Sequence, residues 1–402
     1  MIFSIGLILF VGYLAGRLFA KIRIPGLVGM IAVGFLFGPY CLSLLDPTVL
    51  QISAQLRQIA LVIILTRSGL NLDFASLKKV GRPAVLMCFV PASAEMLGVT
   101  VAAHYLLRLG WFEGMLLGAV LAAVSPAVVS PRMIGLIERG LGEKHAVPKL
   151  VLAGSSVDDV YVIVAFYAFL GLVQSNALQV TSFLLIPVSI LLGVALGCIV
   201  GIPLAFFYKR TNLPLAANVL ILLSLSFGMI GVEELLKPWV SVSSLVGIMA
   251  AGMILLFVAA DKAKEISRGY NALWTFFEVL LFVLVGAEVN FAYLADCGLA
   301  ALAVLAVGLC MRTLGVFLCL VATELTKKER LFAAIAYLPK ATVQASIGGI
   351  ALSAGLSCGN VVLVVSVLAI VVTAPLGAWL IDTLAPKLLD ARQAEKNLKA
   401  GL

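Results

Sequence analysis

Long apolar runs separated by short polar segments extend from one end of the 402-residue chain to the other. A helix of roughly 20 apolar residues crosses a hydrocarbon core about 30 Å thick, and runs of that length recur throughout the sequence. We expect thirteen such helices, at residues 2–20, 24–45, 56–72, 83–107, 111–137, 148–173, 181–208, 214–236, 240–260, 272–292, 298–323, 330–354 and 359–384. The pattern therefore predicts an all-α polytopic membrane protein.

The composition agrees with a membrane protein and excludes several other classes. Apolar residues make up 62% of the chain and charged residues 12%, against about 25% charged residues in soluble domains. The net charge of +8 comes from short basic clusters between the apolar runs, not from a basic face that would bind nucleic acid. The seven cysteines are scattered and show no CxxC spacing. We therefore expect packing thiols, no cofactor and no nucleic-acid partner.

Basic residues divide unevenly between the two sides of the predicted membrane. The segments that follow odd-numbered runs, together with the C-terminal tail, contain twenty Lys and Arg, and the segments that follow even-numbered runs contain three. Cytoplasmic loops carry the excess of positive charge. We therefore expect the N-terminus outside and the C-terminus in the cytoplasm, in a plasma membrane or a bacterial inner membrane. Five basic residues fall inside the runs: Arg17, Arg67, Arg132, Arg312 and Lys340.

Short matches between the two halves of the sequence indicate an internal duplication. The matches are 27–29 with 245–247, 74–77 with 291–294, and 97–99 with 314–316, at offsets of 217 or 218. Corresponding helices are seven runs apart, an odd number, so the two copies would cross the membrane in opposite directions, as in many transporters. We expect two inverted six-helix repeats joined by a linker helix. Their ranges are 1–173, 174–213 for the linker, and 214–402.

Two adjacent acids lie near the middle of the helix expected at 148–173. Asp158 and Asp159 follow Ser155 and Ser156 in the segment GSSVDDV. An ionised acid inside a membrane costs roughly 3 kcal/mol or more, so these carboxylates need a cation, a basic partner or protons. Carboxylate and serine oxygens suit a hard monovalent cation. We therefore predict that a metal ion and protons compete for Asp158 and Asp159, with Ser155 and Ser156 as further ligands.

Two prolines interrupt the expected helices at corresponding positions of the duplication. Pro126 lies in SPAVVSP and Pro339 in LPKATVQ. Because proline removes a helical hydrogen bond, we expect broken helices whose ends border the ion site, although a simple kink would fit the same pattern. The side chains expected at these breaks are Pro126, Val128, Ser130, Pro339, Lys340 and Thr342. Lys340 would balance the half-helix dipoles or pair with an aspartate.

Glu95 and Arg312 are also 217 positions apart, each shortly before the matching Leu-Gly-Val segments. Opposite charges at symmetry-related positions predict a buried salt bridge, because an unpaired buried ion is strongly destabilising. The role of the pair stays open between holding the repeats together and taking part in coupling. If the pair occupies Arg312, both aspartates are left free for cation and protons.

Blander interpretations suffice for the other charged residues. Arg17, Arg67, Arg132, Glu278 and Glu288 lie within about two turns of the run ends, where long side chains reach the membrane surface. His145 lies in a charged polar segment. We expect an ordinary solvated histidine there, with pH sensing as the alternative.

Six motifs spread over nearly the whole chain are LTRSGLNLD at 65–73, AEMLGVTVAAHYLL at 94–107, AVSPAVVSPRM at 123–133, GSSVDDV at 154–160, GAEV at 286–289 and YLPKATVQASIG at 337–348. They resemble the sodium/proton antiporter superfamily, and most closely its NHA branch. The resemblance implies a homodimer with an elevator mechanism. In it, a core formed by the fourth to sixth and eleventh to thirteenth helices moves past a dimerisation scaffold formed by the others.

The resemblance also implies roles for individual residues. Asp159 would be the principal ion and proton carrier, with Asp158 beside it. Electrogenic relatives carry a lysine where this chain has Arg312, whereas NHA-like members pair an arginine there with a glutamate that matches Glu95. Paired aspartates suggest two protons per sodium ion, but the arginine removes one proposed proton carrier, so the stoichiometry stays open.

Together these features predict a secondary transporter, not an enzyme, that exchanges Na⁺ or Li⁺ for H⁺. K⁺/H⁺ exchange is an alternative because the ligand type does not set the ion size. A sodium-coupled organic-anion symporter and a cation channel are alternatives from other functional classes. The expected partners are a monovalent cation, protons, the lipid bilayer and a second copy of the chain.

Overall fold

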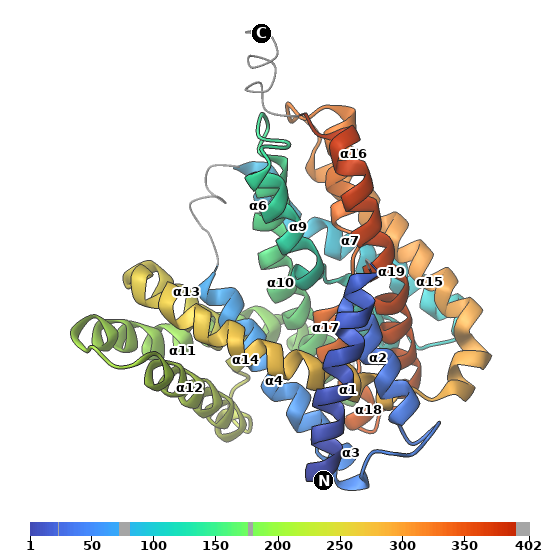
Figure 1. Ribbon diagram of the computed structural model, residues 1–402, viewed down its shortest axis with the longest axis horizontal. Coiled ribbons are helices and arrows are strands. Elements are labelled where there is room, and N and C mark those ends of the chain that lie inside the picture. The colour runs from blue at the N-terminus through green and yellow to red at the C-terminus, as the bar shows by residue number, and fades with distance from the viewer. Residues whose placement is uncertain (23, 72–80, 176–179, 391–402) are drawn as a thin grey trace. The chain divides into compact units, whose positions relative to one another are not determined.

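The computed structural model describes residues 1–22, 24–71, 81–175 and 180–390, and every regular element in them is a helix (Figure 1). This agrees with the predicted all-α class. A helix satisfies its own backbone donors and acceptors, which apolar surroundings require. The chain forms two compact units. Unit 1 comprises Met1–Pro47, Asp73–Val173 and Phe282–Leu402, and unit 2 comprises Thr48–Leu72 and Gln174–Leu281.

Nine helical stretches in the described residues are long and apolar enough to cross a membrane. They are Ile2–Lys21, Arg82–Leu106, Trp111–Glu138, Val147–Gln174, Val188–Arg210, Leu215–Leu236, Ala260–Ala287, Cys297–Cys319 and Gly359–Leu388. Two shorter apolar helices are Gly26–Phe37 and Ser244–Val258. All thirteen expected ranges contain helical residues, but the number of thirteen crossings and the inverted repeats remain predictions.

Unit 2 contains four whole helices and most of a fifth. They are α4 (Ser53–Leu70), α11 (Val180–Arg210), α12 (Leu215–Leu236), α13 (Ser244–Val258) and α14 (Ala260–Ala287). The short helix α3 (Pro47–Gln51) spans the sequence boundary between the units. α11 and α13 pack closely through small residues, and a Cβ on Gly201 would lie 2.9 Å from the Cα of Ala251. A larger residue there would force the two helices apart.

α14 begins at Ala260, whereas the hydrophobic pattern placed the start of that helix at 272. The additional turns are polar. Asp261 lies in the first turn, where an acid complements the helix dipole, and Lys262 pairs with Glu265 over 3.1 Å. The prediction followed the apolar run alone and therefore missed the polar extension of the helix.

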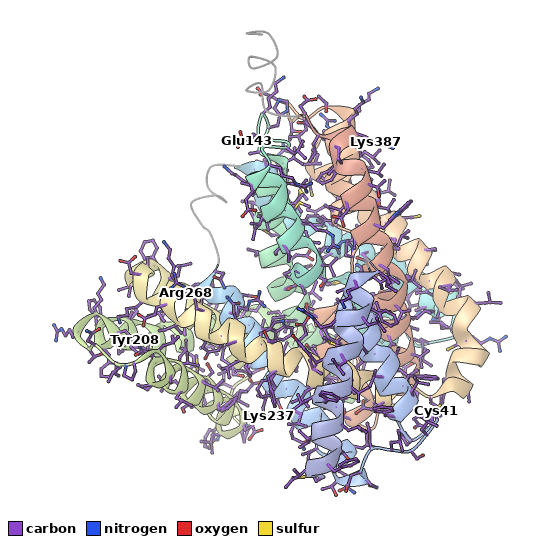
Figure 2. All side chains as sticks on the ribbon, in the orientation of Figure 1. Cys41, Glu143, Tyr208, Lys237, Arg268 and Lys387 are labelled. Atoms are coloured by element: carbon purple, nitrogen blue, oxygen red, sulfur yellow. The ribbon has the colours of Figure 1, made fainter. Side chains whose placement is uncertain are left out.

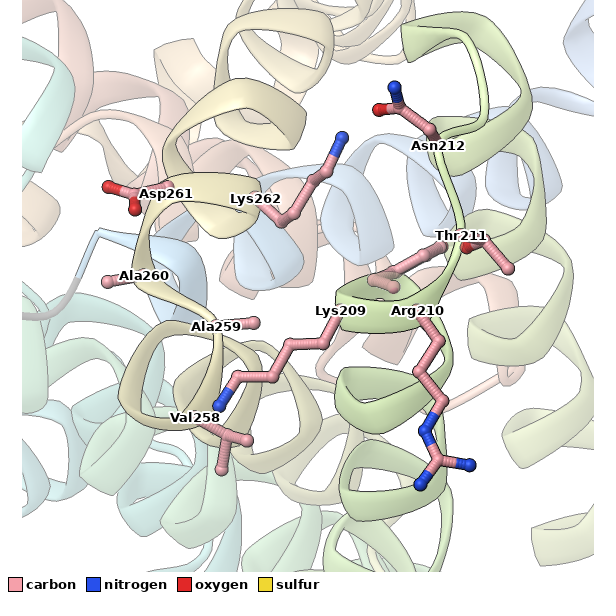
Figure 3. Close-up of a pocket in the computed structure, with 10 residues that line it drawn as sticks. Lys209, Arg210, Thr211, Asn212, Val258, Ala259, Ala260, Asp261 and Lys262 are labelled. Carbon is pink, nitrogen blue, oxygen red and sulfur yellow. The ribbon is translucent and has the colours of Figure 1, made fainter.

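A cavity of about 400 Å³ lies in unit 2, where the end of α11 meets the start of α14 (Figure 3). Lys209, Arg210 and Lys262 line it, and all three belong to the basic segments expected in the cytoplasm. Figure 3 shows the three cationic side chains extending in different directions. The cavity is therefore a basic surface feature without converging charges.

Unit 1 contains the predicted ion site and twelve of the described helices. They are α1 (Ile2–Lys21), α2 (Gly26–Phe37), α6 (Arg82–Met87), α7 (Val90–Leu106), α8 (Trp111–Ala122), α9 (Pro126–Glu138), α10 (Val147–Ser175), α15 (Phe291–Cys319), α16 (Lys327–Ala336), α17 (Thr342–Ile347), α18 (Ile350–Ser353) and α19 (Gly359–Leu388). The last two residues of α10 lie beyond the sequence boundary of the unit. α7 packs against α8 and α15, and α19 contacts α8, α9, α15, α16 and α17. A Cβ on Gly315 of α15 would lie 2.7 Å from the Cα of Pro91, so small residues also allow α7 and α15 to approach closely.

The loops of unit 1 lie at opposite ends according to the predicted alternation. Figure 2 shows Glu143 and Lys387 at one end of the unit and Cys41 at the other. The first two belong to segments expected in the cytoplasm, and Cys41 lies near the end of the helix expected at 24–45 that would face outside. These three residues are therefore placed as the alternation predicts, and which side is cytoplasmic remains a prediction.

Both proline breaks interrupt their helices completely. α8 stops at Ala122 and α9 begins at Pro126, while α16 stops at Ala336 and α17 begins at Thr342. This confirms broken helices rather than simple kinks. Two further interruptions were not predicted, between α6 and α7 and between α17 and α18. They lie beside Pro91, which lacks an N–H donor, and at a Gly-Gly pair with low helix propensity.

Candidate ion-binding site

The two breaks lie against each other in unit 1. The N–H of Ser125 donates to the carbonyl of Pro339 over 2.9 Å, and the Gln344 side chain on α17 donates to the carbonyl of Ala123 over 2.9 Å. Breaking a helix leaves backbone groups that need other partners when they are buried. Each break supplies such partners for the other, which brings the ends of α8, α9, α16 and α17 together.

Arg312 on α15 connects both breaks to the acidic residues, and it is fully buried. Its Nη1 donates to Glu95 Oε2 over 2.7 Å and also to the carbonyl of Ala122. Its Nε donates to the carbonyl of Tyr337 over 2.8 Å, and the guanidinium lies 5.4 Å from the Tyr337 ring centroid. The two carbonyls lie at the C-terminal ends of α8 and α16, where the helix dipole is negative. A cation stabilises both ends.

Asp158 on α10 is held by the same guanidinium. Arg312 Nη2 donates to Asp158 Oδ2 over 2.8 Å, and the N–H of Val124 donates to the same oxygen over 3.0 Å. The expectation that a pair with Glu95 leaves both aspartates free is therefore wrong for Asp158. A planar guanidinium carries five N–H donors, so it can serve two carboxylates and two carbonyls. The symmetry-related positions of Glu95 and Arg312 predicted only one of these four acceptors.

Glu95 on α7 accepts hydrogen bonds from two cations. The predicted contact with Arg312 is present, and Lys340 Nζ also donates to Glu95 Oε2, over 2.6 Å. Lys340 therefore pairs with the glutamate rather than with an aspartate. Its backbone N–H donates to the Thr373 hydroxyl over 2.9 Å, which fixes the second break against α19.

Asp159 differs from its neighbour because no basic side chain in the described part of the chain forms an ion pair with it. Its side chain is 4% exposed, and its Oδ1 is buried without a hydrogen-bond partner among the described residues. The buried cluster of Glu95, Asp158, Asp159, Arg312 and Lys340 contains three carboxylates and two cations. One carboxylate charge, that of Asp159, thus lacks a compensating cation.

Of the two serines predicted as cation ligands on α10, the structure describes the side chain of Ser155. The Ser155 hydroxyl is buried and donates to the Leu152 carbonyl of its own helix over 3.2 Å. The side chain of Ser156 lies outside the described residues. The structure therefore places one serine hydroxyl one helical turn from the aspartates, with its proton directed to the helix backbone.

The predicted residues of the two breaks contribute mainly through position. Pro126 is the first residue of α9, with Val128 buried and Ser130 partly buried on that helix. Thr342 is the first residue of α17, and its hydroxyl oxygen is buried without a partner in the described chain. Pro339 contributes its carbonyl to the contact between the breaks.

Several contributors were absent from the predicted set of site residues. Gln344, Tyr337 and Thr373 bind the breaks or Arg312, and the backbone of Ala122 and Val124 binds the charged side chains. Polar residues inside apolar runs were a usable signal for Gln344 and Thr373. Nothing in the sequence marks a backbone amide or carbonyl, because every residue carries these groups.

A second polar cluster lies at the start of α16. His145 Nδ1 lies 2.9 Å from the Glu329 carboxylate, which also accepts hydrogen bonds from the N–H and the hydroxyl of Thr326 at 2.8 and 2.9 Å. Burial alone would raise the pKa of Glu329, but the hydrogen bonds from Thr326 and His145 hold that pKa below its ordinary value. His145 is only 13% exposed. The interpretation as an ordinary solvated histidine is therefore wrong, because the loop folds back onto the helix start.

Sequence comparison shows which known proteins this chain resembles. The chain matches the family described as sodium/hydrogen exchanger, transmembrane, over residues 6–385. It is 36% identical to the Homo sapiens protein Sodium/hydrogen exchanger 9B2, across 97% of this chain and 75% of that protein. The Mus musculus protein of the same name is 33% identical, across 97% of this chain and 74% of that protein.

A solved structure has a similar fold. The sodium proton antiporter MjNhaP1 from Methanocaldococcus jannaschii gives a TM-score of 0.81, with 23% sequence identity and coverage of 96% of this chain and 98% of that chain. At this identity the similarity concerns the fold alone.

Proposed function

Because this chain belongs to the sodium/hydrogen exchanger family, we propose that it exchanges Na⁺ or Li⁺ for H⁺ across the membrane at Asp159. The observation that carries the proposal is the buried cluster of three carboxylates and two cations, in which Asp159 has no cationic partner among the described residues. Arg312 and Val124 fix Asp158 beside it. The residues of the cluster are suited to transport rather than to an enzymatic reaction.

Competition for Asp159 would couple the two fluxes. A proton or a monovalent cation would each neutralise the carboxylate, and the two cannot bind the same oxygens together. An ionised acid without a partner inside a membrane costs roughly 3 kcal/mol, and about 1.4 kcal/mol corresponds to a factor of ten. A conformational change with an empty, charged site would then be about a hundredfold rarer than one with an occupied site. Exchange would become obligatory for that reason.

The same charge balance favours one proton per cation. Asp158 already interacts with Arg312, and Glu95 interacts with Arg312 and Lys340. One added positive charge neutralises the cluster, whether it is Na⁺ or H⁺. Two protons per cation would require Asp158 to become protonated and to lose its ion pair with Arg312. Arg312 would then keep Glu95 as its one carboxylate partner in the cluster. We propose electroneutral exchange.

The wider parts of the proposal concern movement and assembly. All the residues that form the cluster belong to unit 1, so the site could be carried as one body, which is what an elevator mechanism requires. A homodimer, a plasma-membrane location and a cytoplasmic C-terminus complete the proposal. Oxygen ligands of this type also bind K⁺, so cation selectivity is part of the test.

The test is reconstitution into liposomes that contain a pH-sensitive dye, followed by addition of Na⁺, Li⁺, K⁺ or choline. We expect Na⁺ and Li⁺ to change the internal pH with the wild type, and Asp159→Asn to lower the initial rate at least about a hundredfold, because it removes the uncompensated charge. Asp382→Asn is the matched control, since Asp382 is exposed. A wild type that shows no cation-dependent pH change would sink the proposal.

Clamping the membrane potential in the same assay separates the remaining alternatives. Exchange of one proton per cation should proceed at the same rate at every clamped potential. A rate that changes with potential would reject the electroneutral part of the proposal. Cation flux without proton movement would instead indicate a channel or a symporter.

A further inference from the structure

The Gln344 side chain binds the first break, and the proposed exchange gives this side chain no role. Leu121, Ala122 and Ala123 end α8 with carbonyls that the helix itself does not pair. Arg312 donates to the carbonyl of Ala122, and Gln344 Nε2 donates to the carbonyls of Leu121 and Ala123 over 3.3 and 2.9 Å. Two side chains from the second half of the sequence therefore cap the end of α8.

The hydrogen bonds allow the Gln344 amide only one orientation. Carbonyl oxygens accept hydrogen bonds and never donate them, so the NH₂ group must face Leu121 and Ala123 and Oε1 must face away. Gln344 is fully buried on α17, and its Oε1 has no hydrogen-bond partner among the described residues. The side chain thus satisfies the break through its donors and leaves its own oxygen unpaired.

The bond to Ala123 reaches the ion site through a single peptide unit. The carbonyl of Ala123 and the N–H of Val124 belong to the same planar group. Gln344 binds one end of it, and the other end donates to Asp158 Oδ2 over 3.0 Å. A hydrogen bond to the carbonyl also polarises the peptide and strengthens its N–H as a donor. We infer that Gln344 is a positioning residue that fixes this peptide and, through it, the Asp158 carboxylate beside the cation site.

This inference rests on the proposed function and concerns cation affinity. Gln344 is neutral, so replacing it with another neutral residue leaves the charge balance of the cluster unchanged. Arg312 still holds Asp158 when the amide is lost, so the carboxylate stays near the site. The freed peptide would let Asp158 change its angle, which alters the spacing of the oxygens that a dehydrated cation meets.

The experiment compares Na⁺-dependent exchange in liposomes by wild type, Gln344→Met and Ser346→Ala. Methionine is similar in length to glutamine but has no donor. Ser346 is a matched control on the same short helix, because it is buried and its hydroxyl donates to the Thr342 carbonyl of that helix over 2.8 Å. For Gln344→Met we expect the half-saturating Na⁺ concentration to rise about tenfold while the maximal rate stays within about twofold. Ser346→Ala should change neither value by more than about twofold.

The outcomes distinguish this inference from the proposed function. An inactive wild type would contradict the proposed function itself. An active wild type with an unchanged half-saturating Na⁺ concentration in folded Gln344→Met would overturn the inference alone.

A second variant, Gln344→Asn, keeps the NH₂ group, but its side chain is shorter by one methylene group. Its half-saturating Na⁺ concentration should lie between those of wild type and Gln344→Met. A loss of maximal rate without a change in half-saturation would make the amide a structural support, and so would failure of both Gln344 variants to fold. Either result would overturn the inference.

Discussion

Both breaks interrupt a helix of unit 1 at a segment that contains proline, yet they contribute different chemistry. At the first break, side chains from other helices bind the backbone of Ala122, Ala123 and Val124, and the Ser125 hydroxyl has no hydrogen-bond partner among the described residues. The second break contributes a charge of its own, Lys340, which pairs with Glu95. The first break thus contributes peptide groups, whereas the second contributes the carbonyls of Tyr337 and Pro339 and also a charged side chain.

Arg312 serves both breaks, so its removal should have the largest effect. Arg312→Gln removes one donor from each of two carboxylates and two carbonyls, and breaking a buried ion pair costs about 3–5 kcal/mol. We expect the free energy of unfolding to fall by that amount, measured by thermal or denaturant unfolding in detergent. Arg312→Lys should recover only part of it, because lysine lacks the planar fork of donors.

The matched control for Arg312 is Arg132→Gln. Arg132 is partly exposed and pairs with exposed Asp382 over 3.2 Å, and exposed pairs contribute about 0–1 kcal/mol. Equal destabilisation by the two variants would show that the contacts of Arg312 stabilise the fold no more than an exposed ion pair does.

Lys340 tests the difference between the breaks directly. Lys340→Met removes one of the two cations of the cluster and leaves an additional carboxylate charge, so we expect the exchange rate to fall about tenfold. Ser125→Ala at the first break should stay within about twofold, because its hydroxyl has no partner among the described residues. Both rates come from the liposome assay. Equal effects of the two variants would remove the contrast.

The smallest effect is expected at the starts of the two broken helices. Glu329 binds the N–H of Thr326 at the start of α16, and Glu113 binds the N–H of Gly110 at the start of α8. Only Glu329 also has His145 as a partner, and its pKa lies below the ordinary value after the opposing effect of burial. A carboxyl whose pKa is lowered on folding stabilises the protein above its unfolded-state pKa, and this contribution is lost as the pH falls through the folded-state pKa.

The corresponding measurement is unfolding as a function of pH. As the pH falls from about 7 to about 2, wild type should lose about 1 kcal/mol more stability than Glu329→Gln, because only the wild type protonates this carboxylate. Ser346→Ala, which removes no titratable group, should follow the wild-type pH dependence. Identical pH dependence of wild type and Glu329→Gln would rule out this contribution.

The sequence was most informative where one residue type has few structural options. Proline cannot continue a helical hydrogen-bond ladder, so Pro126 and Pro339 predicted the breaks correctly. The common offset of Glu95 and Arg312 predicted that these residues meet, and they do, at 2.7 Å. Adjacent acids in an apolar run identified Asp158 and Asp159 as candidate ion ligands, a role that stays a prediction.

The sequence was least informative where partners are chosen by three-dimensional packing. It gave no reason for Arg312 to bind Asp158 as well as Glu95, because the number of donors on a guanidinium does not reveal how many acceptors surround it. It also placed His145 in solvent, since the return of its loop to Glu329 involves residues 184 positions apart. The start of α14 was missed because a helix can extend past its apolar run.

Three carboxylates set against two cations have a consequence for the cell as a whole. On the proposed one-for-one exchange, no net charge crosses the membrane, so voltage neither drives nor opposes the cycle. Transport stops when the concentration ratio of sodium across the membrane equals that of protons, and a difference of about one pH unit then balances a sodium gradient of about tenfold. The single uncompensated carboxylate would thereby limit the protein to the energy of concentration gradients and exclude the membrane potential.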